Sequence, residues 1–199
     1  MEDSATMRLY KLDSAEGFAF VNSATDEDDD YFHQIYGDTN RRADDWVAPH
    51  FILRTTLGRQ NLRIPDLHSQ VTSDMFLNDR ARAVIEPVAR EDVEFLPLRL
   101  GDEVIWFMHV VRVIDAIDLE HTEHDRSWGS IDPRRWAFRE EAIPAEVAVF
   151  RLPPNQRFIS PYIYTEGLVD TILDAGLTGR EFQLIWDSDL DTQPFVPPF

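Results

Sequence analysis

The sequence predicts an α+β fold, with a mainly antiparallel sheet and a few packed helices. Three observations lead to this prediction. Most apolar segments have the alternation or the continuous apolar character of strands, whereas only two have helical spacing. Two of the strands are joined directly by a short hairpin loop. Strands and helices do not alternate regularly and no internal repeat is present, which argues against a parallel sheet.

Residues 1–69 are expected to contribute short strands, at residues 7–12, 17–22 and within 46–55. The consecutive acidic residues 26–30 lie between the second and third of these. Because like charges repel, we expect this acidic run to stay extended and solvated. Pro49 restricts the first half of the third strand to a sheet edge or a turn.

Helical spacing first appears after Ser73. The apolar positions of this predicted helix are Leu77, Ala81, Val84, Ile85 and Val88. Ser73 or Asn78 is suited to cap its N-terminus. Pro87 lacks the N–H group that continues a helix, so the regular part is expected to end at Ile85 or Glu86.

The strongest β signal comes next, where residues 93–100 and 103–113 flank a Gly-Asp loop. The second arm is nearly continuous in apolar residues, so we expect it to be a central strand that is buried on both faces. His109 within it is expected to be a hydrogen-bonded core residue. Residues 148–152 form a further strand. Residues 115–142 have little periodicity and are expected to form a surface excursion.

A helix followed by a strand ends the folded part. The helix is predicted over residues 165–175, and Gly176 lies where a left-handed C-cap is needed. Gly179 permits the turn into a strand over residues 181–187. Phe182, Leu184 and Trp186 are predicted to alternate onto one face of that strand. This unit is expected to complete the sheet.

The charge of the chain restricts its partners. The 199 residues include 37 acidic and 19 basic ones, for a formal net charge of −18. Such a surface repels nucleic acid and anionic lipid and favours basic partners. The absence of cysteine excludes disulfides and thiol chemistry. With no apolar signal core and no apolar run of membrane-spanning length, a cytoplasmic location is expected.

The sequence contains no recognisable catalytic constellation. It has neither a serine in a glycine elbow nor a glycine-rich phosphate loop. The strongest metal candidate is residues 115–125, where His121 and His124 lie among carboxylates. A metal-dependent hydrolase at this segment is therefore an alternative, although polar residues at a strand end also explain it. We predict no catalytic residue, no metal and no cofactor.

The tryptophans give further information about partners. Trp106 and Trp186 lie in apolar strands and are expected in the core. Trp46, Trp128 and Trp136 lie in charged, loop-like surroundings, where they either anchor a protein interface or cover a local core. Exposed tryptophans beside an acidic run suit a basic protein partner. A second alternative is an acidic mimic of DNA.

The order of motifs from about residue 70 to 189 resembles a bacterial family of polymorphic-toxin immunity proteins, formerly a domain of unknown function. The motifs are VEFLPLRL, VVRVIDAIDLEH, VFRLP and ILDAGLTGREFQLIWDS. VIDAIDLE and AGLTGREF are the most specific of these. The resemblance implies a single immunity-type domain over residues 1–199, with a divergent N-terminal part over residues 1–69 and a family-like part over residues 70–189.

The resemblance also implies a non-enzymatic protein that neutralises a cognate secreted toxin, most simply by occluding its active site. It marks several residues as scaffold: Phe95, Pro97, Asp115, Asp118, Gly176, Gly179 and Phe182. Toxin contacts diverge with the partner, so candidates come instead from charge and aromatic character. The toxin-binding candidates are Asp26, Glu27, Asp28, Asp29, Asp30, Trp128, Trp136, Asp187 and Asp189.

Overall fold

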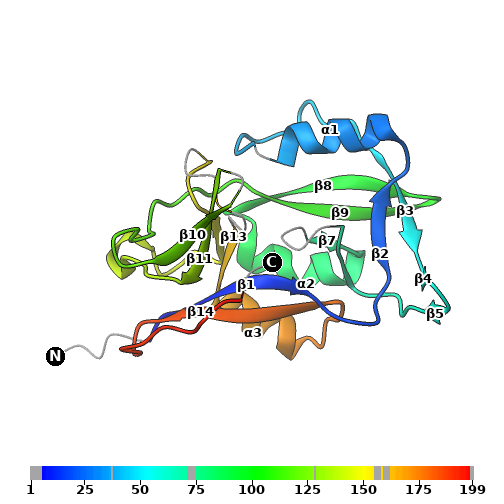
Figure 1. The fold of residues 1–199 in the computed structure, drawn as a ribbon. Coiled ribbons are helices and arrows are strands. Elements are labelled where there is room, and N and C mark those ends of the chain that lie inside the picture. Colours follow the sequence, from blue (N-terminus) through cyan, green and yellow to red (C-terminus); the bar gives the residue numbers. More distant parts are fainter. Residues whose placement is uncertain are drawn as a thin grey trace.

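Two β-sheets form the fold, with helices α2 (Asp79–Ala89) and α3 (Glu166–Asp174) packed in the core that they share, whereas α1 (Asp26–Tyr36) lies on the other face of the larger sheet (Figure 1). The computed structural model describes residues 6–36, 38–70, 75–127, 129–154, 158 and 162–197. The larger sheet has the strand order β2-β3-β8-β9-β7-β6, and the smaller sheet has the order β12-β13-β1-β14. Among the described residues, every strand pair in these sheets is antiparallel except β3 with β8. The predicted α+β fold with mainly antiparallel sheets is confirmed.

The elements have the following bounds. The larger sheet contains β2 (Phe20–Ser23), β3 (His50–Arg54), β6 (Leu67–His68), β7 (Phe76–Leu77), β8 (Val93–Leu100) and β9 (Glu103–Val110). The smaller sheet contains β1 (Arg8–Ser14), β12 (Val149–Arg151), β13 (Tyr162–Thr165) and β14 (Arg180–Asp187). Two short hairpins are β4 (Thr56–Leu57) with β5 (Gln60–Asn61), and β10 (Glu123–Ser127) with β11 (Ser130–Arg135). The helices are α1 (Asp26–Tyr36), α2 (Asp79–Ala89), α3 (Glu166–Asp174) and the short 3-10 helix η1 (Glu140–Ala142). Within the described ranges, no helix is long and apolar enough to cross a membrane.

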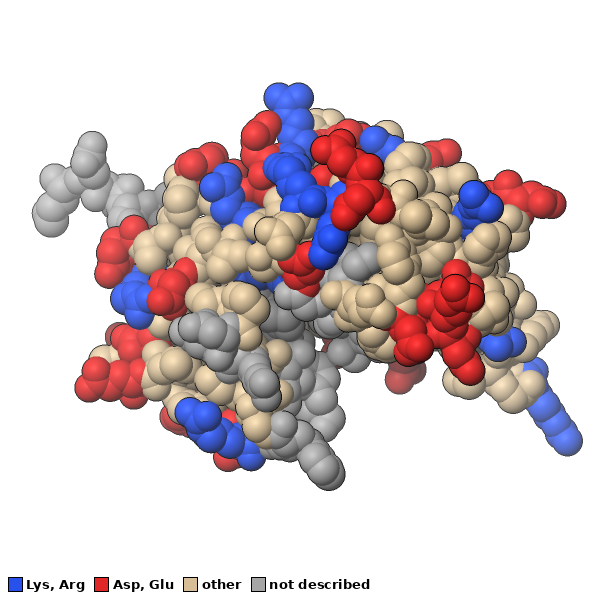
Figure 2. Space-filling view, turned by 90° about the horizontal axis from the view of Figure 1, so that it is seen from above, with Lys and Arg blue, Asp and Glu red and all other residues tan. Residues whose placement is uncertain are grey.

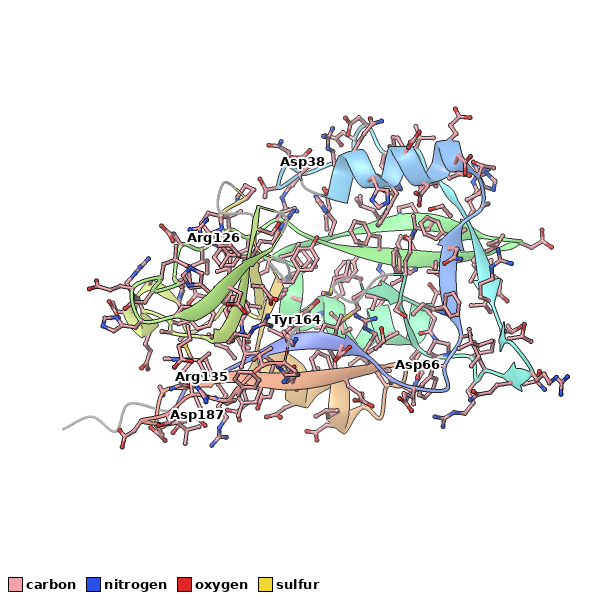
Figure 3. All side chains as sticks on the ribbon, viewed as in Figure 1. Asp38, Asp66, Arg126, Arg135, Tyr164 and Asp187 are labelled. Atoms are coloured by element: carbon pink, nitrogen blue, oxygen red, sulfur yellow. The ribbon has the colours of Figure 1, made fainter. Side chains whose placement is uncertain are left out.

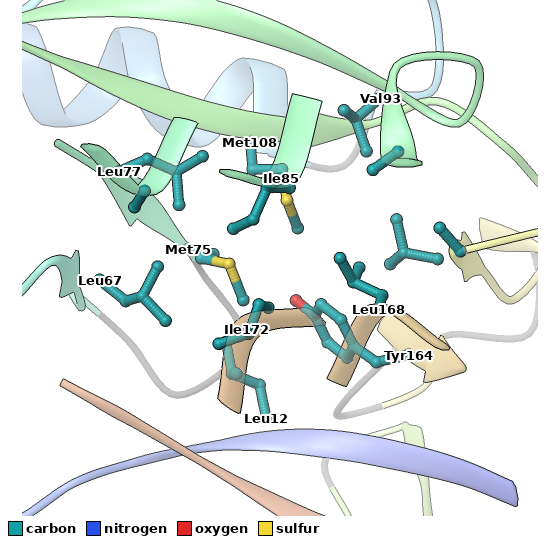
Figure 4. Packing of buried hydrophobic residues seen from close by; sticks show 14 of the residues in the cluster. Leu12, Leu67, Met75, Leu77, Ile85, Val93, Met108, Tyr164, Leu168 and Ile172 are labelled. Atoms are coloured by element: carbon teal, nitrogen blue, oxygen red, sulfur yellow. The ribbon is translucent and has the colours of Figure 1, made fainter. Parts of the chain in front are cut away.

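A central hydrophobic cluster joins the two sheets (Figure 4). It includes Ile85 of α2, Leu168 and Ile172 of α3, Met108 of β9 and Leu12 of β1, all of them buried. Because these residues come from both ends of the chain, neither sheet can bury its inner face without the other. Burying such side chains contributes about 1.5–3 kcal/mol each.

The β8–β9 hairpin forms as the sequence predicts, except that its second strand ends at Val110 and not at residue 113. The strands pair from Val93 with Val110 to Leu100 with Glu103, and Gly101 has a positive φ of 62° in the connecting turn. β9 is an interior strand, flanked by β8 and β7. His109 is fully buried, and its Nε2 lies 3.0 Å from the carbonyl oxygen of residue 40. The prediction of a hydrogen-bonded core histidine is therefore confirmed.

Helix α2 extends further than predicted. Asn78 caps it, since its side-chain oxygen accepts a hydrogen bond from the N–H of Ala81 at 2.8 Å. Ser73, the other predicted cap, lies outside the described residues. The prediction that Pro87 ends the regular part at residue 85 or 86 is wrong, because the helix continues to Ala89. Ala89 is fully buried in the central cluster, and this packing holds the last turn despite the missing N–H.

A β-bulge in β14 changes the predicted side-chain alternation. Leu9 of β1 pairs with Trp186, but Tyr10 pairs with Leu184, so Ile185 is an extra residue in the ladder. One extra residue moves the following side chain to the opposite face. Phe182 packs against the central cluster, whereas Trp186 lies in a second cluster on the other face of the sheet. The prediction that they share a face is wrong.

The second cluster covers the outer face of the smaller sheet. Ile163 of β13 and Phe150 of β12 point into it, whereas their neighbours Tyr164 and Val149 point into the central cluster. Each strand of this sheet therefore supplies apolar side chains to both faces. A strand that is buried on both sides needs a covering layer on each of them.

Residues 114–147, which include the β10–β11 hairpin, supply the covering layer. Ala116, Ile131 and Phe138 from this segment are buried in the second cluster. Trp136 is only 1% exposed, and its ring stacks on that of Phe138 with centroids 5.7 Å apart. The expected surface excursion is therefore a part of the core. Of the two roles that the sequence left open for Trp136, the structure shows the cover of a local core and not an exposed interface anchor.

The acidic run forms the start of helix α1, so the prediction that it is extended is wrong. Thr25 caps this helix: its Oγ1 accepts a hydrogen bond from the N–H of Asp28 at 3.1 Å and donates one to the Asp28 carboxylate at 2.7 Å. Carboxylates in a first turn also interact favourably with the helix dipole. Phe32 then anchors α1 on the larger sheet, within a third cluster that includes Phe51 and Phe107.

Asp66 joins three segments of the chain. Its carboxylate accepts hydrogen bonds from Asn78 and Arg80 at the start of α2, and from Thr178 in the turn after α3. Burial acts to raise the pKa of Asp66, but these hydrogen bonds outweigh it and hold the pKa below its usual value. The same turn contains Gly179, whose φ is 111°.

We expect the stability of the fold to fall as the pH drops from about 6.5 to about 4. Burial lowers the pKa of His68 to about 4, against about 6.5 in an unfolded chain. The unfolded state therefore binds a proton first, and the free energy of unfolding decreases by about 2–3 kcal/mol across that window. Burial also lowers the pKa of His109, so part of the slope should persist without His68. Denaturation of His68→Gln over this pH range should show a weaker dependence, and an unchanged slope would contradict the assignment.

Candidate partner-binding surface

The carboxylates of the acidic run have two different roles. Asp28 accepts a hydrogen bond from the backbone N–H of His50 at 2.9 Å, which lowers the pKa of the carboxyl. Asp29 accepts hydrogen bonds from Ser23 at 2.9 Å and from Gln70 at 3.2 Å. These two residues tie α1 to its neighbours, so they serve the fold.

Asp26, Glu27 and Asp30 are the exposed members of the run. Asp26 and Asp30 are four residues apart and lie on one side of the helix, with Glu27 about 100° round its axis. Within the part of the chain that the structure describes, none of the three has an ion-pair partner. Figure 2, viewed from the side of α1, shows acidic side chains gathered at the end where this helix begins. This face, defined by Asp26, Glu27 and Asp30, is called the acidic face below.

A groove of about 530 Å³ lies beside the acidic face. Its α1 side is formed by Thr25, Glu27, Asp28 and Tyr31, and its other side by Val47, Ala48, Pro49, His50 and Arg99. The Tyr31 hydroxyl accepts a hydrogen bond from the N–H of Val47 at 3.1 Å, so the two sides are tied together. The Val47 side chain is 70% exposed at the groove.

Trp46 packs against Tyr31, one of the residues that line this groove. It is half-buried, its Nε1 donates a hydrogen bond to the carbonyl oxygen of Pro97 at 2.7 Å, and its ring lies 5.7 Å from that of Tyr31. The sequence places Trp46 among possible interface anchors, but Tyr31 and Val47 were not predicted as site residues. The sequence around Val47 does not mark it as a site residue, and its role becomes visible only in the fold, which places it opposite α1.

The other acidic candidates lie on a different part of the molecule. Asp187 is at the lower left of Figure 3, whereas α1 lies along the top. Its carboxylate accepts a hydrogen bond from Arg8 Nε at 2.8 Å, an interaction that lowers the Asp187 pKa, and another from the N–H of Asp189. Asp189 is exposed and accepts a hydrogen bond from the Thr6 hydroxyl. The structure does not bring these residues together with the acidic run.

The two tryptophan candidates cannot be used as exposed anchors in the structure. Trp136 is buried in the second cluster. Trp128 lies outside the described residues.

The two histidines of the alternative metal site each contact a nearby oxygen of residues 118–122. His121 Nδ1 lies 2.7 Å from a carboxylate oxygen of Asp118, which raises the His121 pKa. His124 Nδ1 lies 3.0 Å from the carbonyl oxygen of Thr122. Among the described residues, no three His, Asp or Glu side chains converge as metal ligands would. The geometry gives the hydrolase alternative no support.

Comparison with family models identifies one match. The model described as "Immunity protein family (Imm11)" matches residues 15–187. The match starts well before residue 70, so it includes β2, α1 and β3, which the sequence motifs did not place. A search of curated proteins gave no match. Because the family model covers most of the chain, this protein belongs to the Imm11 immunity protein family.

Proposed function

We propose that this Imm11 protein neutralises a cognate secreted toxin by binding it directly and covering its active site. Membership of an immunity protein family over residues 15–187 is the observation that carries the proposal. Occlusion needs no catalytic group, since a bound protein excludes substrate by its volume. The proposal takes residues 1–199 as one immunity-type domain, and a central cluster drawn from both ends of the chain supports this single domain. The proposal also has the domain meet the toxin in the cytoplasm.

The acidic face is the proposed contact region. Its three carboxylates lack ion-pair partners among the described residues, and the chain carries a net charge of −18. Unpaired surface charges of one sign speed encounters with a partner of opposite charge. The partner would therefore present a basic surface. Asp28, Asp29 and Asp187 are assigned to the fold, because their carboxylates are bound within the chain.

Neutralising the acidic face should slow toxin binding. For the variant Asp26→Asn/Glu27→Gln/Asp30→Asn, we expect the association rate constant at low salt to fall by about 3–10-fold, with a weaker salt dependence. The binding partner in this test is the cognate toxin domain, sought first in the neighbouring open reading frame, and the rates are followed by surface plasmon resonance. Duplex DNA added as competitor tests the DNA-mimic alternative.

A matched control separates local from overall charge. Glu141→Gln/Asp170→Asn/Asp174→Asn removes the same number of exposed carboxylates at η1 and α3. This variant should associate nearly as fast as the wild type. Equal slowing by both variants would remove the acidic face from the proposal, and failure of the wild type to protect cells that express the toxin would remove the proposed function itself.

A further inference from the structure

We propose that the groove between α1 and Val47 receives a lysine or arginine side chain from a toxin segment. The inference rests on the proposed function and specifies the partner's chemistry at the same face. It depends on three features of the groove: its apolar lining, its local charge and its rigid sides.

The lining suits an alkyl chain. Tyr31, Val47, Ala48 and Pro49 present mostly carbon to the groove, and Val47 is largely exposed. Covering exposed apolar surface of this kind with a partner removes it from water, which lowers the free energy. Lysine and arginine have long alkyl stems that pack on apolar surface while the charged head remains at a polar edge.

The charge around the groove favours a cation. Glu27 lines it directly, and Asp26 and Asp30 stand on the adjoining side of α1. The Asp28 carboxylate also faces the groove, although it is bound to the N–H of His50. Two carboxylates thus line the groove and two more lie beside it, against one guanidinium in its lining.

That guanidinium belongs to Arg99 of β8, with Nη1 3.4 Å from Nε2 of His50. It disfavours a second cation on its own side of the groove. The entering cation is therefore directed to the α1 side, where Glu27 has no ion-pair partner among the described residues.

The sides of the groove are held in place before any partner arrives. The hydrogen bond from Val47 to Tyr31 and the one from His50 to Asp28 both cross between the two sides. Trp46 packs against Tyr31 and donates a hydrogen bond to the carbonyl oxygen of Pro97 in β8. A preformed groove loses little conformational entropy on binding, so contacts made there contribute more of their energy to affinity.

Two single variants test the groove in binding to the same cognate toxin domain. Glu27→Gln should weaken the affinity by about 10-fold and lower its salt dependence, because it removes the pairing charge. Val47→Ser should weaken the affinity by about 5–10-fold through faster dissociation, with an unchanged salt dependence. Leu57→Ser, at another exposed aliphatic residue, is the control and should bind like the wild type.

The occupant is identified by a double-mutant cycle. Each surface lysine and arginine of the toxin domain is changed to glutamine, and each variant is measured against wild-type protein and against Glu27→Gln. One toxin position should lose about 10-fold in affinity against the wild type and little against Glu27→Gln.

Each outcome of this scan decides the matter. Wild-type binding with no toxin position coupled to Glu27, or with Val47→Ser and Glu27→Gln both binding like the wild type, overturns the groove assignment and leaves the proposed function standing. Absence of wild-type binding and protection overturns the proposed function, and the groove assignment falls with it.

Discussion

Replacing Gly179 with alanine is expected to destabilise the protein by about 2–5 kcal/mol, from the left-handed backbone and the lack of space together. The φ of Gly179 is 111°, a conformation that residues with a side chain rarely adopt. A Cβ there would lie 2.3 Å from the carbonyl oxygen of Leu67 and 2.3 Å from the Cβ of Pro65. Neither contact is tolerable, and the obstructing oxygen belongs to the backbone.

Gly176 provides a matched control within the same turn. Its φ is 62°, also left-handed, but a Cβ there would meet nothing within 4 Å. Gly176→Ala should therefore cost only about 1–2 kcal/mol, from the backbone conformation alone. Chemical denaturation of both variants measures the difference. Equal destabilisation by the two substitutions would show that the close approach to residues 65–67 is not what requires glycine at position 179.

Replacing Phe32 with alanine should destabilise the fold by about 3–5 kcal/mol, since a large buried aromatic side chain is removed. Phe32 is 1% exposed, and its ring lies 4.9 Å from that of Phe107 and 5.6 Å from those of Phe51 and Phe76. It also packs α1 on the larger sheet through the third cluster. Its loss should therefore loosen the acidic face and weaken toxin binding as well.

The control for this substitution is Phe195→Ala. Phe195 is 56% exposed, so its removal should change the unfolding free energy by no more than about 0.5 kcal/mol. Thermal and chemical denaturation give the stabilities, and the toxin association rate shows the effect on α1. A Phe32→Ala variant as stable as Phe195→Ala would contradict the role of the third cluster in anchoring the helix.

The sequence predicted correctly those elements that depend only on residues close together in the chain. The β8–β9 hairpin, the cap at Asn78 and the left-handed Gly176 all follow from nearest neighbours along the chain. Repulsion between the carboxylates, taken alone, predicts an extended acidic run, but the run is helical. A capping threonine and a helix dipole stabilise adjacent carboxylates in a first turn, and Phe32 supplies the buried contact that completes the helix.

Tertiary packing decided the elements that the sequence did not predict. Trp136 is in charged sequence surroundings, yet the smaller sheet has an apolar outer face that residues 114–147 cover together with Phe158 and Val196. The bulge at Ile185 depends on pairing with β1, which is about 175 residues away in the chain. No local pattern contains either piece of information.

The candidate surface was predicted only in part. Net charge and the acidic run predict a contact surface at residues 26–30. The sequence does not distinguish Asp28 and Asp29, which accept hydrogen bonds from other residues of the chain, from their exposed neighbours. The groove was not predictable at all. It exists because β3 and the residues before it lie against α1, an arrangement set by the third cluster.

Amide hydrogen exchange of the complex with the toxin domain tests the acidic face and its groove most directly. Binding should slow exchange at residues 28–31, 47, 48 and 50, and leave residues 187–191 at the rate of the free protein. Protection confined to the far side of the molecule, with unchanged exchange along α1, would contradict the assignment of this surface.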